Sequence, residues 1–199
     1  MAKDLNVTQI QEAVQKKYAA VSQSAEGRFQ YPTGRAGVEA LGYDLSLVGQ
    51  LPDEVVESFC GVGNPFSLGA FRPGETILDV GCGAGFDLIV ASYLVGPSGQ
   101  VCGIDLTPEM VERARMNLKR AGVSNGQVHR AGSEAIPYAD GTFDVVISNG
   151  VLNLSPLKET SFEEIYRVLK PHGRLQFADI VVKADLPAEV ATSLEAWSE

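Results

Sequence analysis

A glycine-rich stretch, LDVGCGAG at residues 78–85, holds the residues best suited to binding a ligand. Its glycines, Gly81, Gly83 and Gly85, allow a tight backbone turn and let a ligand approach without meeting a side chain. A helix is predicted to begin directly after them, so its positive end favours an anionic group at the same place. Asp79 precedes the first glycine, where a carboxylate suits a cation such as a primary amine and disfavours a pyrophosphate.

A second acidic residue, Asp105, follows Gly85 by 20 residues at the end of a predicted strand. An acid at that point can accept both hydroxyls of an unphosphorylated ribose. A dinucleotide fingerprint has the spacing GxGxxG, but here the third glycine comes one residue early and Phe86 stands in its place. The two acids and the glycines therefore predict a ligand with a ribose and an amine, which describes S-adenosylmethionine. A nicotinamide dehydrogenase is the weaker alternative.

The elements that would position these residues alternate between strands and helices after residue 74. This alternation predicts an α/β fold, a doubly wound, mostly parallel sheet with about five strands. In such a sheet the ligand lies beyond the carboxyl ends of the strands, where both acids are expected. The predicted strands are 76–80, 101–105, 128–131, 143–148 and 175–182. The predicted helices are 86–95, 108–121, one with Phe162, Ile165, Tyr166 and Leu169 on one face, and 186–197.

Residues 1–73 have a different pattern. A helix with one apolar face is predicted near residues 7–21, with a capping box between Thr8 and Gln11. Residues 22–42 are predicted to be a mobile connector, and a short helix is predicted at 52–59. We therefore expect an N-terminal helical lid and substrate-side segment at 1–73 and a ligand-binding core at 74–199.

Composition excludes several classes of protein. The chain has 199 residues and a formal net charge of −9, which argues against a nucleic-acid partner and against an anionic membrane surface. No apolar stretch is long enough to span a bilayer. Three cysteines and two histidines with no metal-ligand spacing predict no metal site and no disulfide scaffold, as in a reducing cytoplasm. The oligomeric state is not predictable from these features.

Four segments resemble the successive motifs of class I S-adenosylmethionine-dependent methyltransferases, a Rossmann-like family: LDVGCGAG, GIDLTPEM, FDVVISNGVLNLSP and RVLKPHGRL. Within that superfamily the chain is most similar to the arsenite methyltransferases, through GVGNPFSLG at 61–69, IDLTPEM and SNGVLNLSP. The resemblance implies S-adenosylmethionine as the cofactor. The cofactor-binding residues it implies, together with those expected from the loop itself, are Asp79, Gly81, Cys82, Gly83, Gly85, Asp105, Leu106, Gly132, Ser133 and Asn149.

The chain departs from the family pattern at several positions. Family members often carry an acid where this chain has Gly132, so the adenine is expected to use backbone groups such as the N–H of Ser133. Arsenite methyltransferases usually have cysteines where this chain has Val62 and Gly150. Cys60 lies two residues from the first of these positions and is the cysteine we expect as a substrate ligand.

The sequence thus predicts a methyltransferase for a small molecule, with arsenite or a related metalloid as the leading acceptor. A quinone precursor or another metabolite is the alternative acceptor, and a non-catalytic cofactor-binding module is the alternative class. Tyr18 and Asn153 are further candidates for the substrate side, and no convincing general base is found. Class I sheets have seven strands and only five are predicted here, so the closing hairpin is expected to be missing, either because the chain is a fragment or because a partner completes it.

Overall fold

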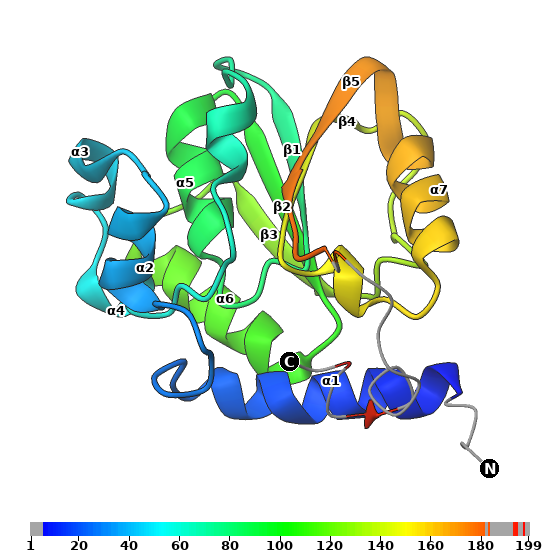
Figure 1. The fold of residues 1–199 in the computed structure, drawn as a ribbon. Coiled ribbons are helices and arrows are strands. Elements are labelled where there is room, and N and C mark those ends of the chain that lie inside the picture. Colours follow the sequence, from blue (N-terminus) through cyan, green and yellow to red (C-terminus); the bar gives the residue numbers. More distant parts are fainter. Residues whose placement is uncertain (1–5, 182, 184–192, 195–196, 198–199) are drawn as a thin grey trace.

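The computed structural model describes residues 6–181, 183, 193–194 and 197. A five-stranded sheet with the strand order β3-β2-β1-β4-β5 lies at its centre, and every neighbouring pair is parallel. This arrangement confirms the predicted doubly wound α/β fold (Figure 1). The strands are β1 (Thr76–Val80), β2 (Gln100–Asp105), β3 (Gly126–Arg130), β4 (Phe143–Asn149) and β5 (Leu169–Ala178).

Helices cover both faces of the sheet. Helices α5 (Phe86–Val95) and α6 (Pro108–Arg120) lie on one face, and α7 (Lys158–Val168) lies on the other (Figure 1). Because side chains alternate along a strand, Ile77 of β1 joins the core on the α5 side, whereas Leu78 joins the core on the α7 side. The same alternation directs Asp79 toward α5.

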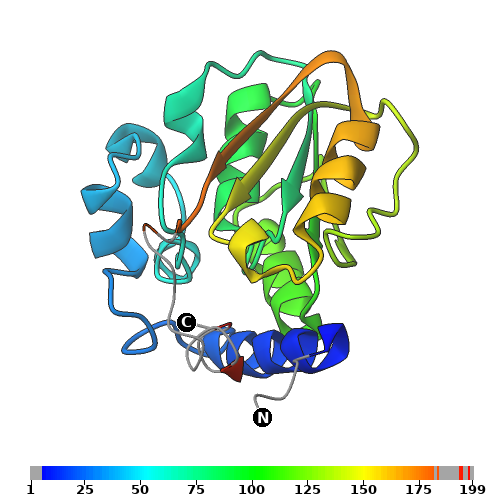
Figure 2. The same ribbon diagram turned by 45° about the vertical axis from the view of Figure 1, so that its right-hand side comes forward.

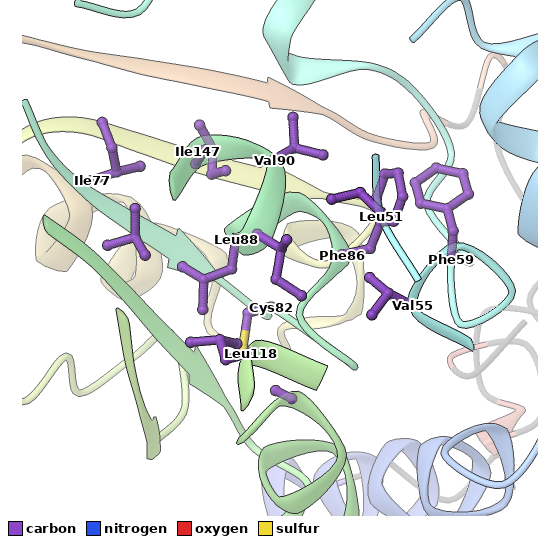
Figure 3. Packing of buried hydrophobic residues seen from close by; sticks show 14 of the residues in the cluster. Leu51, Val55, Phe59, Ile77, Cys82, Phe86, Leu88, Val90, Leu118 and Ile147 are labelled. Atoms are coloured by element: carbon purple, nitrogen blue, oxygen red, sulfur yellow. The ribbon is translucent and has the colours of Figure 1, made fainter. Parts of the chain in front are cut away.

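The N-terminal segment contains α1 (Val7–Val21), α2 (Gly34–Ala40), α3 (Leu45–Val48), α4 (Asp53–Val56) and the short 3-10 helix η1 (Pro65–Leu68). Helix α1 lies across the carboxyl ends of the strands and packs on α6, as Figures 1 and 2 show from two directions. The other helices pack beside α5, where Phe59 contacts Phe86 with ring centroids 4.9 Å apart (Figure 3). One apolar core therefore joins this segment to the sheet.

Two predictions for the N-terminal segment are wrong. The capping box forms between Asn6 and Gln9 instead of Thr8 and Gln11, so the N-cap lies two residues earlier than the polar pattern suggested. The expected connector at 22–42 contains α2, whose N–H of Gly34 donates to the carbonyl of Phe59 at 2.7 Å. A long-range contact of this kind fixes a helix that local composition does not indicate.

The predictions around α7 also need correction. Phe162 and Tyr166, expected on the buried face, are 40% and 82% exposed, because Ser161, Ile165 and Val168 form that face instead. Strand β5 begins directly after α7 and ends at Ala178, with His172 at a φ of 66° where the strand is irregular. Most of the predicted helix at 186–197 lies outside the described residues. None of the helices in the described part of the chain has the length and apolarity to cross a membrane.

Candidate functional site

The glycine-rich loop joins β1 to α5 at the carboxyl edge of the sheet. Gly81, Gly83 and Gly85 have φ values of 71°, 50° and 87°, a region that favours glycine. The N–H groups of Gly81 and Cys82 donate to the carbonyl of Ile104 at 2.8 and 2.9 Å, which ties the loop to β2. No atom lies within 4 Å of the position that a Cβ of Gly83 would take, so the main chain is open to a ligand there.

Asp105 ends β2 beside this loop. Its Oδ2 accepts the N–H of Gly83 at 2.9 Å, and its Oδ1 accepts the N–H of Thr107 at 2.8 Å. Burial raises the pKa of Asp105 to about 6, although these hydrogen bonds act in the opposite direction. Each carboxylate oxygen has a second lone pair, so Asp105 can still accept hydroxyl groups from a ligand at the cavity surface.

Asp79 is the unusual residue of the site. It is 2% exposed, and its Oδ2 is buried without a hydrogen-bond partner in the described part of the chain. Burial raises the pKa of Asp79 well above its usual range, and the nearby carboxyl groups of Asp87 and Asp105 raise it further. An unpartnered buried carboxyl group is costly unless a cation neutralises it, so this position can hold an ammonium group.

A hydrogen-bonded network that the sequence did not indicate lies next to Asp79. Asp87, in the first turn of α5, accepts the Tyr43 hydroxyl at 2.8 Å and the Nδ2 of Asn149 at 2.9 Å. Burial raises the pKa of Asp87 to about 6, and both hydrogen bonds act to lower it. The partners are separated by 44 and 62 residues in the chain, so no local spacing could have linked them.

Asn149 also fixes the loop at 61–69. Its Oδ1 accepts the N–H groups of Val62 and Gly63 at 2.9 and 3.0 Å, and its Nδ2 donates to the carbonyl of Gly63 at 2.9 Å. A side chain with this many partners positions the surrounding main chain more than it offers groups to a ligand. Asn149, which the resemblance implies as a cofactor-binding residue, borders both cavities, but most of its hydrogen-bonding capacity is already used.

Replacing Asn149 with alanine is expected to lower the free energy of unfolding by about 3 kcal/mol, because the N–H groups of Val62 and Gly63 lose their acceptor. The matched control is Asn153→Ala, since the Oδ1 of Asn153 is buried without a partner in the described residues and its removal should cost less than about 0.5 kcal/mol. Urea unfolding of both variants measures the difference. Equal destabilisation would contradict the assigned role of Asn149.

Two cavities meet at the glycine-rich loop, and Cys60, Gly81, Gly83 and Asn149 border both of them. The smaller cavity reaches the two buried acids, Asp79 and Asp87. The larger cavity extends past Asp105 toward the residues that follow β3. It also contacts α1, so this helix forms a roof. The larger cavity is bordered by Tyr18, Leu106, Gly132, Ser133, Glu134, Val151 and Ser155, among others.

The structure separates the remaining sequence candidates. Cys60 and Tyr18 border the larger cavity, whereas Asn153 borders neither cavity. Burial raises the pKa of Cys60 to about 12, so its thiol is protonated at neutral pH. Cys82 is buried, and its Sγ lies 2.8 Å from the position that a Cβ of Gly103 would take. Cys82 therefore fills a gap between the loop and β2, and Gly103 is needed to leave that gap.

Val62 and Gly150 lie next to each other, and Gly150 borders the larger cavity whereas Val62 borders neither cavity. A Cβ on Gly150 would lie 3.1 Å from the Cγ1 of Val62. Gly150 also has a φ of 72°, which favours glycine at this position. Within the described residues, no three His, Cys, Asp or Glu side chains form a group that could hold a metal ion.

A methyltransferase-domain family model matches residues 71–199, which is more than half of the chain. The chain belongs to the methyltransferase-domain family. The matched range includes the whole sheet, the glycine-rich loop, Asp79 and Asp105.

Individual proteins that are similar to this chain carry more specific names. An arsenite methyltransferase from Halobacterium salinarum is 37% identical over 96% of this chain and 52% of its own length. A ubiquinone/menaquinone biosynthesis C-methyltransferase from Klebsiella pneumoniae is 42% identical over 52% of this chain and 42% of its own length. The crystal structure of an arsenic(III) S-adenosylmethionine methyltransferase from Chlamydomonas reinhardtii superposes with a TM-score of 0.66 and 38% identity, over 73% of this chain and 51% of that one. The chain spans about half the length of the curated relatives it matches.

Proposed function

We propose that this methyltransferase domain binds S-adenosylmethionine and transfers its methyl group to a small molecule, with arsenite or a related metalloid as the leading acceptor. The observation that carries the proposal is the buried, unpartnered Oδ2 of Asp79 beside an open glycine main chain. A cationic amine is the ligand group that this atom lacks. The names of the relatives in Halobacterium salinarum and Chlamydomonas reinhardtii support the choice of acceptor.

The residues of the site fit this cofactor from end to end. Asp79 would hold the amino group in the smaller cavity, and the main chain from Gly81 to Gly83 would lie along the amino-acid chain. Asp105 would accept the ribose hydroxyls at the border of the larger cavity. The base would then lie over Leu106, toward the residues that follow β3.

S-adenosylmethionine, when bound, supplies a methyl group that is already activated on a sulfonium sulfur. The protein's own contribution is to orient the acceptor and exclude water, effects that together can lower a barrier by about 7–11 kcal/mol. Helix α1 supports this role because Val14 and Tyr18 cover the larger cavity. No histidine borders either cavity in the described residues, which suits an acceptor that attacks through a lone pair without losing a proton first.

A second acceptor class is favoured because positions 62 and 150 hold a valine and a glycine, which offer no thiol to a metalloid. Soft metalloids are bound by thiolates, and Cys60 is the one cysteine that borders the larger cavity. Its raised pKa keeps the thiol protonated until an acceptor displaces the proton. A quinone precursor or another carbon or oxygen acceptor would instead pack on apolar side chains of the larger cavity such as Val151 and Leu154, and a relative is named for such chemistry.

We expect S-adenosylhomocysteine to bind with micromolar affinity in calorimetry, and radiolabelled methyl transfer to arsenite with an added small thiol to exceed transfer to a phenolic quinone precursor. The reverse order would support the second acceptor class. Binding without transfer to any acceptor would indicate a non-catalytic module. Tight binding of a pyridine dinucleotide with no binding of S-adenosylhomocysteine would overturn the proposal.

The cysteines and the net charge support a cellular location and a class of partner for this activity. Cys60, Cys82 and Cys102 are all free thiols, which suits a reducing cytoplasm. The acidic surface, with a net charge of −9, supports a small-molecule partner and opposes binding to nucleic acid or to an anionic membrane.

A further inference from the structure

We infer that Tyr43 is a positioning residue that couples the cofactor end of the site to the loop at 61–69. Its hydroxyl group can donate its proton either to Asp87, which borders the smaller cavity, or to the carbonyl of Gly63 in the loop. This inference rests on the proposed function, since the group that would select between the two acceptors is the ammonium of the bound cofactor.

The ring of Tyr43 is fixed between these two acceptors. It is 5% exposed and packs edge-on against Phe59 and Phe86, with ring centroids 5.3 and 5.5 Å apart. The hydroxyl oxygen lies 2.8 Å from the Oδ1 of Asp87 and 3.0 Å from the carbonyl oxygen of Gly63. A hydroxyl group has a single proton, so only that proton has to rotate for the hydrogen bond to change its acceptor.

The hydrogen bonds around Tyr43 leave one acceptor without a proton of its own. The Nδ2 of Asn149 lies 2.9 Å from the carbonyl oxygen of Gly63, 2.9 Å from the Oδ2 of Asp87 and 3.2 Å from the hydroxyl oxygen of Tyr43. An amide nitrogen carries two protons and a hydroxyl carries one, whereas the acceptors are these three oxygens and the Oδ1 of Asp87. When Tyr43 donates to Asp87, the carbonyl of Gly63 therefore has to share the amide of Asn149.

In the ligand-free protein the negative charge of the acid pair resides on Asp87. Asp87 accepts hydrogen bonds from Tyr43 and Asn149, whereas the Oδ2 of Asp79 has no partner in the described residues. Hydrogen bonds of this kind stabilise the ionised form of a carboxyl group. The nearby thiol of Cys60 adds no charge at neutral pH, because its pKa is raised to about 12. A carboxylate accepts more strongly than a backbone carbonyl, so Tyr43 donates to Asp87 in this state.

The ammonium group of the cofactor would reverse this preference. Asp79 and Asp87 border the same cavity, so a cation bound to Asp79 acts on the charge of Asp87 at short range. The tyrosine proton then turns to the carbonyl of Gly63, and the loop gains a hydrogen bond. Val62 of this loop lies beside Gly150 at the larger cavity. The acceptor side of the site is therefore held most firmly once the methyl donor is in place.

Hydrogen exchange measured by mass spectrometry on peptides that cover residues 61–69, with and without saturating S-adenosylhomocysteine, tests this coupling. In the unchanged protein the ligand should slow exchange about fivefold, which corresponds to one added hydrogen bond. Tyr43→Phe keeps the ring contacts and removes the hydroxyl, so the ligand should slow exchange less than about twofold.

Asp87→Asn should have the opposite effect on the ligand-free protein. Its amide can donate to the hydroxyl oxygen of Tyr43, which turns the hydroxyl proton to Gly63 without any ligand. Exchange in ligand-free Asp87→Asn should be about fivefold slower than in the ligand-free unchanged protein, and the ligand should slow it less than about twofold further.

The control is Tyr31→Phe, since the hydroxyl of Tyr31 donates to the carbonyl of Cys60 at 3.2 Å, one residue before the loop. This variant should show the full slowing by the ligand. Equal slowing in Tyr43→Phe and Tyr31→Phe would overturn the inference, and so would fast exchange in ligand-free Asp87→Asn or no slowing in an unchanged protein that binds the ligand. If Tyr43→Phe fails to fold in circular dichroism, Asp87→Asn decides the question. An unchanged protein that does not bind S-adenosylhomocysteine in calorimetry would contradict the proposed function itself, and the coupling with it.

Discussion

Asp79→Asn is expected to make the ligand-free protein more stable while it removes most of the affinity for S-adenosylhomocysteine. Asp79 is 2% exposed with an unpartnered Oδ2, and its ionised form is costly inside the fold. An amide of the same shape carries no charge, so the free energy of unfolding at pH 8 should rise by about 1–3 kcal/mol. The ammonium group of the ligand loses its only carboxylate partner in the proposed site, and binding should weaken about 100-fold.

The pH dependence separates this account from a simple packing effect. Because the native pKa of Asp79 lies above the unfolded value, the native state binds protons more tightly, and stability falls as pH rises from about 4 through the native pKa. The same carboxyl group binds an ammonium ion better once ionised, so affinity for S-adenosylhomocysteine should increase as the pH rises through the native pKa of Asp79. In Asp79→Asn both dependences should be smaller, and what remains belongs to Asp87 and Asp105, whose pKa values are about 6.

Asp144→Asn is the matched control for this experiment. Asp144 accepts the N–H of Thr76 and the ammonium of Lys170, both at 2.8 Å, and the hydrogen bond and charge of Lys170 hold its pKa below its usual range. The same substitution should therefore destabilise the protein there and leave ligand binding unchanged. If the assignment is correct, thermal unfolding shows a higher melting temperature for Asp79→Asn and a lower one for Asp144→Asn. Calorimetry then shows weaker ligand binding for Asp79→Asn alone. Destabilisation by Asp79→Asn, or unchanged binding, would contradict it.

Asp105→Ala is expected to weaken S-adenosylhomocysteine binding at least tenfold, and up to about 100-fold. Hydrogen bonds to a charged acceptor contribute about 1.5–3 kcal/mol, and this variant also frees the N–H of Gly83, which shapes the loop. The unchanged protein should discriminate against the 2′-deoxy analogue, and the variant should not, since it has no carboxylate to distinguish them. Retained discrimination in Asp105→Ala would exclude this residue as the ribose acceptor.

Asp105→Asn separates the contribution of the charged hydrogen bonds to the ligand from the contribution of the loop shape. The amide keeps one oxygen for a backbone N–H and removes the charge, so the loop should be less disturbed than in the alanine variant. We expect its affinity to lie between those of the unchanged protein and Asp105→Ala. Glu159→Gln, which alters an exposed acid on α7, controls for the change of net charge.

The parts of the site that the sequence predicted are those fixed by local geometry. The glycine spacing requires a particular loop, and Asp105 ends a strand whose apolar run is visible in the sequence, so the loop and the end of β2 lie where expected. Both acids border the cavities, and their roles toward a ligand stay predictions.

The parts that the sequence did not predict depend on contacts between distant residues. Nothing in the predicted helix at 86–95 marks Asp87, and only the fold brings Tyr43 and Asn149 onto its carboxylate. Glu134 was likewise passed over, because nothing in its own segment shows that its carboxylate fills the space beside Gly132. Phe162 and Tyr166 show the reverse case, in which an apolar spacing suggested a buried face but both rings are exposed, although Phe162 contacts Phe177 of β5 with ring centroids 6.0 Å apart.

The side chain of Asn149 holds the loop at 61–69 through hydrogen bonds to the main chain of Val62 and Gly63. These bonds do not depend on the side chain at position 62. Position 62 can change in size or polarity while its main chain stays in place, and the neighbouring position 150, which borders the larger cavity, sets how much room each change has. A scaffold built this way can drift from one acceptor to another during evolution by a few substitutions, without having to rebuild the half of the site that holds the methyl donor.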